Sequence, residues 1–510
     1  MPAGWEVCPL DDVARLVRGI TFPTDVKRHE PQEGHVACLR TANVQFQVEW
    51  DDLWYVPRKY VKNQDQYVRT GDVLISTANS YELVGKVAQI NSPRIEASLG
   101  AFISLLRTEP GVNASYFYYL LSSDSIQRAI REKASTTTNL SNVSGAKLKQ
   151  LQLPIAPSAE QIRIVEKLEE LLSDLDAGVA ELKTAQQKLQ RYRQSLLKAA
   201  VEGALTAEWR QKNPPTETGA ELLQRILRER RARWEEQQLA KFTASGKAPP
   251  KGWKDKYPEP QPPKTEGLPE LPGGWVWATL GQCFRVAVGA TPSRQEPSYW
   301  DGDIPWVSSG EVRFQRVQVT KETITAAGLA NSSTQLNPRG SVLLGMIGEG
   351  KTRGQVAILD IEAANNQNCA AIWVTETEMP PEFVYAWLWS RYEETRRGSS
   401  GNNQPALNKA LVERMLMPLP PLNEARESVR CLQDFMDRVS ELERLVERSL
   451  RQSSIQRQNI LRAAFRGELV PQEPNDERAS VLLERLRAER GGAVQSPRKS
   501  RKKTREETSA

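Results

Sequence analysis

Histidine and cysteine are scarce in this chain of 510 residues, and their positions exclude several classes of protein. The two histidines, His29 and His35, lie in one N-terminal segment, which argues against a histidine-based hydrolase or a zinc site. The five cysteines are scattered, and no two of them form a CxxC pair. We therefore expect buried free thiols in a reducing compartment.

Long apolar runs and a strong charge of one sign are also missing. No run of about 18 apolar residues occurs, so no transmembrane helix is expected. The start, Met1–Glu6, has neither the basic end nor the apolar core of a signal peptide, so we expect a cytoplasmic location. The net charge of +6 permits a polyanionic partner without requiring one. The basic end, Arg498–Arg505, is typical of a solvated, disordered tail.

What the sequence does contain is a long internal repeat, which indicates two related halves. The segment Pro2–Trp5 matches Pro272–Trp275, and Gly71–Ile75 matches Gly340–Leu344. Single matches between these segments include Leu10 with Leu280, Gly19 with Gly289, Thr21 with Thr291, Val44 with Val312 and Phe46 with Phe314. The offset drifts between 268 and 270, as loop insertions between paired strands would produce. Each half therefore begins with a variable globular part.

The second part of each half matches without a gap. Leu153–Pro157 corresponds to Met417–Pro421 at an offset of 264, and that offset continues through Leu205 and Leu469. A gapless match suits a rigid helix, because one inserted residue would rotate its apolar stripe by about 100°. Prolines before the stripe, and Gly203 and Gly467 after it, predict where the two helices end.

Apolar residues recur in these segments at heptad spacing, which predicts a coiled coil. The expected seam residues are Leu168, Leu175, Leu182, Leu189 and Leu196 in the first helix, and Leu432, Val439, Val446 and Ile460 in the second. Gln186 and Arg193 interrupt the first seam, and Ser453 and Arg457 interrupt the second at nearly matching places. Two helices of equal phase in one chain predict an intramolecular antiparallel pair, each about 65 Å long. The alternative is that each helix packs on its own domain.

The globular parts have a mixed pattern. Strand-like segments at Asp72–Ser76 and Val84–Ile90 flank a polar loop, and Gly340–Gly345 and Gly354–Leu359 do the same in the second half. Amphipathic helices are expected at Asn113–Lys133 and Pro381–Arg397, and a charged helix at Gly219–Lys241, followed by an extended proline-rich linker at Pro249–Pro272. The predicted fold class is α+β: two pseudo-symmetric mixed α/β domains separated by a long antiparallel two-helix coiled coil. The expected segments are 1–157, 158–205, 206–271, 272–421, 422–470 and 471–510.

Two motifs resemble catalytic signatures. Gly345–Thr352 satisfies the phosphate-loop pattern GxxxxGK[ST], but a strand-like segment follows it where a phosphate loop needs a helix. Nucleotide binding, a structural turn, and a polar hairpin loop with Lys351 and Arg353 facing DNA remain alternatives. Asn213–Thr216 resembles the motif of amino-methyltransferases, but Thr216 cannot stack on a flipped base, so we interpret it as a linker.

Matched polar loops supply candidate DNA contacts. Asn and Gln pair bidentately with adenine, and Ser, Thr and basic side chains reach phosphates or base edges, while ordinary polar turns are the alternative. The candidates in the first half are Arg40, Thr41, Asn43, Thr77, Asn79, Ser80, Tyr81, Thr137 and Asn139. Those in the second half are Ser308, Ser309, Glu311, Arg313, Glu349, Lys351, Thr352, Arg353, Asn402, Asn403 and Gln404. No catalytic or metal-binding residues are expected.

The duplicated layout resembles the specificity subunits of type I restriction–modification enzymes over about residues 2–490. The resemblance rests on a domain opened by Gly-Trp, a proline segment, and a long helix closed by Leu196–Gly203 or Ile460–Gly467. The run from Gly348 to Gln355 is also similar to a stretch in the variable domains of that family.

The resemblance implies that each globular domain is a target-recognition domain that reads one half of a split, asymmetric double-stranded DNA site. It implies that the paired helices act as a spacer and carry two methyltransferase subunits, and that restriction subunits join them. S-adenosylmethionine and ATP with magnesium are then expected in those partners, with no cofactor and no catalysis in this chain. The competing hypotheses are a coiled-coil adaptor without DNA readout and a nucleotide hydrolase that uses the loop Gly345–Thr352.

Overall fold

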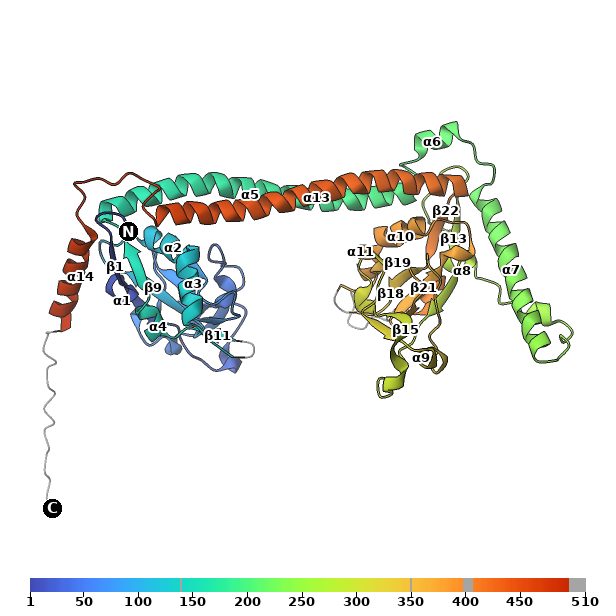
Figure 1. The fold of residues 1–510 in the computed structure, drawn as a ribbon, viewed down its shortest axis with the longest axis horizontal. Helices are drawn as coiled ribbons and strands as arrows, with labels where there is room; N and C mark the ends of the chain where they lie inside the picture. Colours follow the sequence, from blue (N-terminus) through green and yellow to red (C-terminus); the bar gives the residue numbers. More distant parts are fainter. Residues whose placement is uncertain (138–139, 349–350, 398–406, 495–510) are drawn as a thin grey trace, which may run out of the picture. The chain divides into compact units, whose positions relative to one another are not determined.

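The computed structural model describes residues 1–137, 140–348, 351–397 and 407–494, and the chain divides into two compact units. Unit 1 contains Met1–Lys183 and Glu447–Ala510, and unit 2 contains Thr184–Val446. Each unit holds one globular α/β domain together with a stretch from each of two long helices (Figure 1). The α+β architecture predicted from the repeat is present.

The globular domain of unit 1 is built on an antiparallel four-stranded sheet in the order β2-β9-β5-β7. A second sheet has the order β4-β3-β8, with β3 and β8 parallel, and smaller sheets have the orders β1-β12 and β10-β11-β6. The strands are β1 (Glu6–Pro9), β2 (Ala14–Arg18), β3 (His35–Leu39), β4 (Trp54–Pro57), β5 (Val73–Ser76), β6 (Ala78–Asn79), β7 (Val87–Gln89), β8 (Ala97–Leu99), β9 (Ile103–Thr108), β10 (Ser135–Thr136), β11 (Ser141–Asn142) and β12 (Gln152–Ile155).

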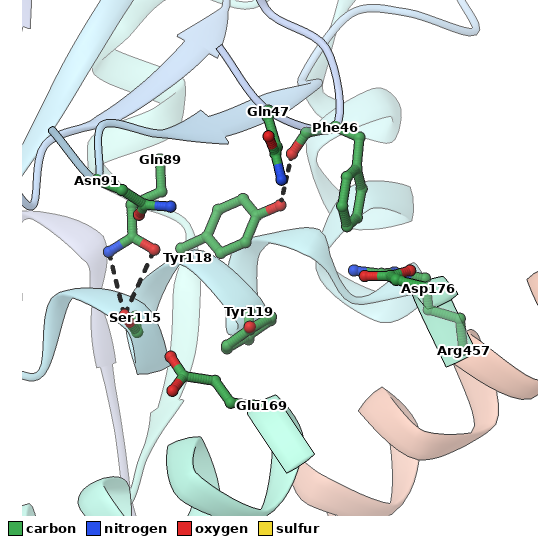
Figure 2. A pocket seen from close by; sticks show the side chains of 10 residues that line it. All are labelled: Phe46, Gln47, Gln89, Asn91, Ser115, Tyr118, Tyr119, Glu169, Asp176 and Arg457. Atoms are coloured by element: carbon green, nitrogen blue, oxygen red, sulfur yellow. Dashed lines mark hydrogen bonds and ion pairs between the residues drawn. The ribbon is translucent and has the colours of Figure 1, made fainter. Parts of the chain in front are cut away.

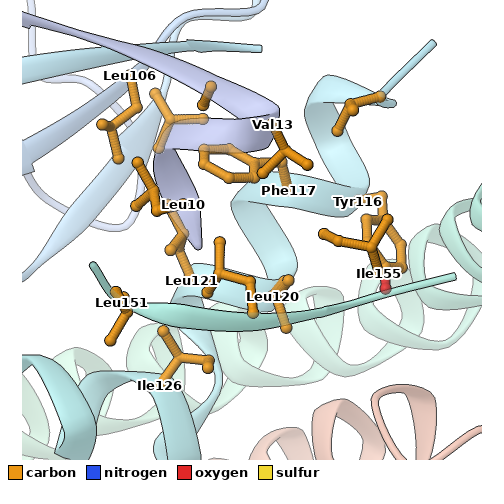
Figure 3. Packing of buried hydrophobic residues seen from close by; sticks show 14 of the residues in the cluster. Leu10, Val13, Leu106, Tyr116, Phe117, Leu120, Leu121, Ile126, Leu151 and Ile155 are labelled. Atoms are coloured by element: carbon orange, nitrogen blue, oxygen red, sulfur yellow. The ribbon is translucent and has the colours of Figure 1, made fainter. Parts of the chain in front are cut away.

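The main core of unit 1 lies between the first sheet and its helices. The helices are α1 (Leu10–Val13), α2 (Ala114–Ser122), α3 (Asp124–Lys133) and α4 (Gly145–Lys149). Leu10, Tyr116 and Phe117 are fully buried there, packed together as Figure 3 shows. The same cluster includes Leu168 and Leu461 from the long helices, so the helix pair shares the domain's core instead of merely touching its surface.

Unit 2 repeats this plan with one additional strand in its main sheet. Its main sheet has the order β14-β21-β18-β19-β16, where β16 adds in parallel to β19, and the second sheet has the order β17-β15-β20. The strands are β13 (Val276–Thr279), β14 (Arg285–Val288), β15 (Trp300–Val307), β16 (Gln315–Val317), β17 (Glu322–Ile324), β18 (Val342–Gly345), β19 (Val356–Leu359), β20 (Ala364–Asn365), β21 (Cys369–Trp373) and β22 (Leu416–Leu419, paired with β13). The helices of the domain are α8 (Leu280–Cys283), α9 (Ala326–Ala330), α10 (Pro381–Ser390), α11 (Tyr392–Arg397) and α12 (Lys409–Glu413).

The two long helices are α5 (Ser158–Val201) and α13 (Leu422–Ala464), and they run antiparallel within each unit. In unit 1, Arg457 of α13 pairs with Asp176 of α5 at 2.7 Å. In unit 2, Ser428 Oγ donates to the carbonyl of Ala200 at 2.8 Å. Of the seam residues, Leu168, Leu196, Leu432 and Val439 are buried, and Leu175, Leu182, Leu189, Val446 and Ile460 are half-buried.

Glycine ends both helices, as predicted. Gly203 and Gly467 have φ angles of 75° and 72°, a left-handed conformation that costs other residues free energy. The backbone therefore turns away from each helix axis within three residues of the last helical position.

Two helices that the sequence predicted as continuous are each broken in two. At Ser123 the backbone is extended, with ψ of 143°, and the Ser123 Oγ donates to the carbonyl of Leu120 at 2.7 Å. This side-chain bond replaces a helical one and ends α2 before α3 begins. At Arg391 the backbone again leaves the helical region, which separates α10 from α11. The predicted spans were right, but their continuity was wrong.

The proline-rich stretch was predicted as an extended linker, and that prediction was wrong for its first part. Residues 249–260, here called the strap, fold back on the charged helix α7 (Gly219–Ala244). Trp253 stacks on Trp234 with ring centres 5.9 Å apart, and Tyr257 meets the same ring edge-on at 5.4 Å. Lys254 pairs with Glu235 at 2.8 Å. Aromatic contacts of this kind outweigh the extended preference of prolines.

One helix near the end of each half packs on its globular domain through an arginine, α7 in unit 2 and α14 (Ala479–Val494) in unit 1. In unit 2, Arg230 of α7 donates to the carbonyl oxygens of Gly281 and Phe284, the latter at 3.0 Å. In unit 1, Arg490 of α14 donates to the carbonyl of Asp11 and pairs with Glu109 at 2.6 Å. α6 (Ala207–Lys212) lies between α5 and α7 in the chain.

Four of the cysteines, Cys8, Cys38, Cys283 and Cys369, are buried free thiols, and burial raises the pKa of each to about 12. Within the described ranges, none of the helices has the length and apolar character that crossing a membrane requires.

Candidate nucleic-acid interface

In unit 1 the structure brings two of the predicted polar loops together. β6, which follows the buried strand β5, pairs with β11, and β11 pairs with β10. The candidates near Thr77–Tyr81 thus lie beside those near Ser135–Asn142, although about 60 residues separate them in sequence. Thr137 N donates to the carbonyl of Leu140 at 2.9 Å, which closes the β10–β11 turn. Asn139 lies outside the described residues.

The side chains on this small sheet differ in what they can contact. Tyr81 is 50% exposed, Thr137 is exposed, and Asn79 and Ser80 are half-buried. Thr77 is buried, and its Oγ1 donates to the carbonyl of Phe102 at 3.0 Å. Thr77 therefore supports the loop, and the exposed neighbours are the groups that could reach DNA.

Sequence reasoning missed Phe102, whose ring is 62% exposed beside this sheet. An exposed aromatic side chain next to polar groups can stack on a base or a sugar. The sequence pattern carried no signal for it, because Phe102 sits just before a strand whose apolar residues are all expected to be buried.

In unit 2 the corresponding polar loop is the turn of a β-hairpin. Gly345 N donates to the carbonyl of Gln355, and Gly354 N donates to the carbonyl of Gly345, each at 2.8 Å. Residues 351–354 form a turn that leads directly into β19. The helix N-terminus on which a phosphate loop depends therefore does not follow Lys351. This geometry favours the hairpin alternatives over nucleotide binding.

Helix α11 supports this hairpin turn. The Tyr392 hydroxyl donates to the carbonyl of Lys351 at 2.8 Å, and Arg353 donates to the carbonyl of Arg396 at 3.2 Å. The Lys351 side chain is exposed and Thr352 is half-buried. Of the other candidates in this region, Glu349, Asn402, Asn403 and Gln404 lie outside the described residues.

A second matched pair of candidate loops forms short 3-10 turns, at Thr41–Asn43 and Ser309–Glu311. The buried Asn43 amide accepts from Arg40 N at 2.9 Å and donates to the carbonyl of Glu49 at 2.9 Å. The buried Glu311 carboxylate accepts from Ser308 N and Lys321 N, each at 2.9 Å.

These bonds hold Asn43 and Glu311 in their turns, and a DNA contact by either residue stays a prediction. Arg40 is likewise engaged, since it pairs with Asp52 and lies 5.0 Å from the centre of the Trp54 ring. Thr41, Ser308 and Ser309 remain half-buried at the turns, and Arg313 is exposed.

Comparison with known proteins identifies one family. The model of the type I restriction modification DNA specificity domain matches residues 2–185 and again 272–450. The specificity subunit of the EcoKI type I restriction enzyme from Escherichia coli is 32% identical over 216 residues, which cover 42% of this chain and 46% of that protein. The EcoDI specificity subunit, also from Escherichia coli, is 24% identical over 80% of this chain and 85% of its own length.

The stretch shared with EcoKI spans less than half of that relative's length. Among solved structures, one on the complex assembly and conformational transition of the type I R-M system contains a similar chain. The two chains superpose with a TM-score of 0.61 at 16% identity, over 92% of this chain and 99% of the other, which shows a shared fold.

Proposed function

This chain belongs to the type I restriction modification DNA specificity domain family, and from that we propose that it reads a split, asymmetric DNA site with its two globular domains. The observation that carries the proposal is the duplicated unit, in which a hairpin and a polar turn recur at matched positions on two domains of different sequence. Two unlike domains give two unlike half-sites. Direct readout then comes from the exposed Tyr81 and Lys351 and from the half-buried Asn79, Ser80 and Arg353 beside them.

We also propose that the helix pair carries two methyltransferase subunits and, through them, restriction subunits. Exposed apolar side chains on α13 support this: Leu442 is 49% exposed, Leu445 is 48% exposed and Ile455 is 62% exposed. Apolar groups in contact with water along a helix favour burial against a partner. In this arrangement S-adenosylmethionine and ATP with magnesium bind the partner subunits, and this chain supplies no catalytic group.

A methylome tests the proposal. The chain is co-expressed with a type I methyltransferase subunit from the same genome, and N6-methyladenine is mapped by single-molecule sequencing. We expect a two-part motif with a fixed unspecified gap that disappears when this chain is omitted. A soluble methyltransferase complex that methylates no such motif would contradict the proposal.

A domain replacement separates the two half-sites. When residues 272–420 are exchanged for the second domain of another family member, one half of the motif should change and the other half should stay. A change in both halves would show that the domains do not read independently. The coiled-coil adaptor hypothesis predicts instead no salt-sensitive binding to duplex DNA, since phosphate contacts always release counterions.

A further inference from the structure

Two arginines that interrupt the predicted seams occupy matched positions, Arg193 on α5 and Arg457 on α13. Their side chains are 24% and 19% exposed. Arg193 pairs with Glu443 at 2.5 Å in unit 2, and Arg457 pairs with Asp176 at 2.7 Å in unit 1. A charged residue in a coiled-coil seam lowers stability, so helix packing alone does not account for either arginine.

Arg457 also contacts the globular domain of unit 1. Its guanidinium carbon lies 4.1 Å from the centre of the Phe46 ring. Figure 2 shows both side chains among those that line the pocket. The Tyr118 hydroxyl donates to the carbonyl of Phe46 at 3.2 Å and so ties this loop to α2. One arginine thus joins α13, α5 through Asp176, and the globular domain through Phe46.

Two pockets flank the contact between Phe46 and Arg457. Pockets of about 250 Å³ and 430 Å³ both have Phe46, Tyr118, Tyr119 and Arg457 in their walls. The contact between the loop and the helices therefore lies at the edge of the apolar core, since Leu461 of that core also lines the larger pocket.

Unit 2 makes the same connection through one additional ring. Phe314, the match of Phe46, stacks on Trp389 of α10 with centres 4.9 Å apart and planes at 20°. Arg193 lies 5.8 Å from the centre of the Trp389 ring. Ser122 occupies the corresponding position of α2 in unit 1, and because it is small, Phe46 itself meets the arginine there.

We propose that Arg193 and Arg457 are positioning residues that hold each globular domain at a fixed angle on the helix pair, and so restrict the gap between the two half-sites to one length. This inference rests on the proposed function. Each additional base pair shifts a half-site by about 3.4 Å and rotates it by about 35°. A domain that can tilt on its helices would accept a neighbouring gap length, and a domain held by a cation–π contact and an ion pair would not.

The test uses the full chain in complex with its methyltransferase subunit. Plasmids carry the two half-sites at the preferred gap and at gaps one base pair shorter and longer. For Arg457→Met we expect methylation at the neighbouring gaps, relative to the preferred one, to rise about tenfold. Arg193→Met should act alike, and the bases read within each half-site should not change.

Matched variants control for stability. Arg451→Met removes an arginine of α13 that is 78% exposed and lies 3.9 Å from Glu447 of the same helix, so the gap preference should stay as in the wild type. Arg457→Lys keeps a charge near Asp176 but loses the flat guanidinium, and we expect an intermediate effect. Phe46→Leu keeps most of the side-chain volume and removes the π face, so it should also widen the range of gap lengths that are methylated.

The outcomes distinguish the inference from the function it rests on. A wild-type complex that yields no two-part motif overturns both. A wild-type motif with unchanged gap preference in folded Arg457→Met overturns the positioning role alone, as does a change in the bases read. If Arg457→Met fails to fold, Arg457→Lys and Phe46→Leu decide, and unchanged gap preference in both overturns the role.

Discussion

The indole nitrogen of Trp5 donates to the buried carboxylate of Glu160 at 3.0 Å. The matched Trp275 donates to Glu424 at 2.8 Å. The tryptophan that opens each half of the repeat therefore fastens its domain to the first turn of a long helix.

The two carboxylates differ in their other partners. Glu160 Oε1 is buried without a hydrogen bond among the described residues, whereas Glu424 also accepts from Thr206 at 2.7 Å and Arg210 at 2.8 Å. This difference makes the two matched sites a natural comparison.

Replacing each tryptophan by phenylalanine should lower the free energy of unfolding by different amounts at the two matched sites. Trp5→Phe leaves the Glu160 carboxylate buried without its donor, while Trp275→Phe leaves Glu424 with two others. The lost ring volume is the same in both. We expect Trp5→Phe to lower the free energy of unfolding by about 2 kcal/mol more than Trp275→Phe, measured by urea denaturation. Equal losses would show that the indole hydrogen bond contributes little beyond packing.

The pH dependence should report on Glu160. Burial raises the pKa of its carboxyl above the ordinary 4.5, although the Trp5 hydrogen bond opposes this. The folded chain then binds the proton more tightly than the unfolded chain, so this group stabilises below the unfolded pKa, and the contribution is lost as pH rises through the raised folded value. In Glu160→Gln we expect that slope to be absent, so its stability relative to wild type increases with pH. Urea midpoints of wild type and Glu160→Gln, measured from pH 4 to 8, test this. If burial does not destabilise the ionised carboxylate, the two curves of midpoint against pH will be parallel.

Glu424→Gln is the matched control and should destabilise the chain. It removes the charge partner of Arg210, whose side chain is only 21% exposed. Breaking such a buried pair is expected to cost about 3 kcal/mol at pH 7. Thermal unfolding of the two glutamine variants side by side would test this, and a stabilised Glu424→Gln would contradict it.

Lys351 should contribute to DNA binding and not to nucleotide binding. If its exposed side chain meets a phosphate, Lys351→Ala should reduce the slope of log K against log salt by about 1 and leave the recognised bases unchanged. Fluorescence anisotropy with a duplex at several salt concentrations measures the slope. Tight ATP binding by the purified chain that Lys351→Ala abolishes would restore the phosphate-loop hypothesis.

The strap should come loose when its aromatic anchor is removed. Trp253 stacks on Trp234 and meets Phe242 edge-on at 5.9 Å. Trp253→Ala should therefore speed limited proteolysis of the strap, residues 249–260, while the two domains stay intact. Trp277→Ala is a suitable control, since its indole bonds outside the strap, to the carbonyl of Pro269. Equal cleavage rates in Trp253→Ala and wild type would show that the stacking does not hold the strap.

The helix pair could be predicted from the sequence because apolar residues at heptad spacing, matched without a gap in both halves, fit two long helices that pack along one apolar stripe. The breaks at Ser123 and Arg391 could not, since a serine side chain that replaces a helical bond leaves no trace in periodicity. The strap was missed for a different reason: proline content signals extension, and the tryptophan contacts that reverse it depend on a helix some 20 residues away.

Among the candidate DNA contacts, composition alone did not separate Asn79 from Asn43. Both are asparagines in polar loops, yet one is half-buried beside a sheet edge and the other is buried under its own turn. Only the backbone geometry makes that distinction. Likewise, the heptad pattern shows Arg193 and Arg457 only as interruptions of the seam. Their contacts with the Trp389 and Phe46 rings become visible only in the structure.

The core of the first domain is completed only when helix α14, near the end of the chain, has been synthesised. Leu482 and Leu486 belong to the core of unit 1, and Ala479 N donates to the carbonyl of Gly4 at 2.9 Å. During translation the ribosome must add roughly 300 residues after Lys183 before this helix exists, which takes about 15–60 s. Throughout that interval the apolar face that α14 covers in the folded chain lacks its own segment. A chaperone that shields this face, or a slow stretch of codons in the second half, would therefore decide the yield of a domain that was synthesised first.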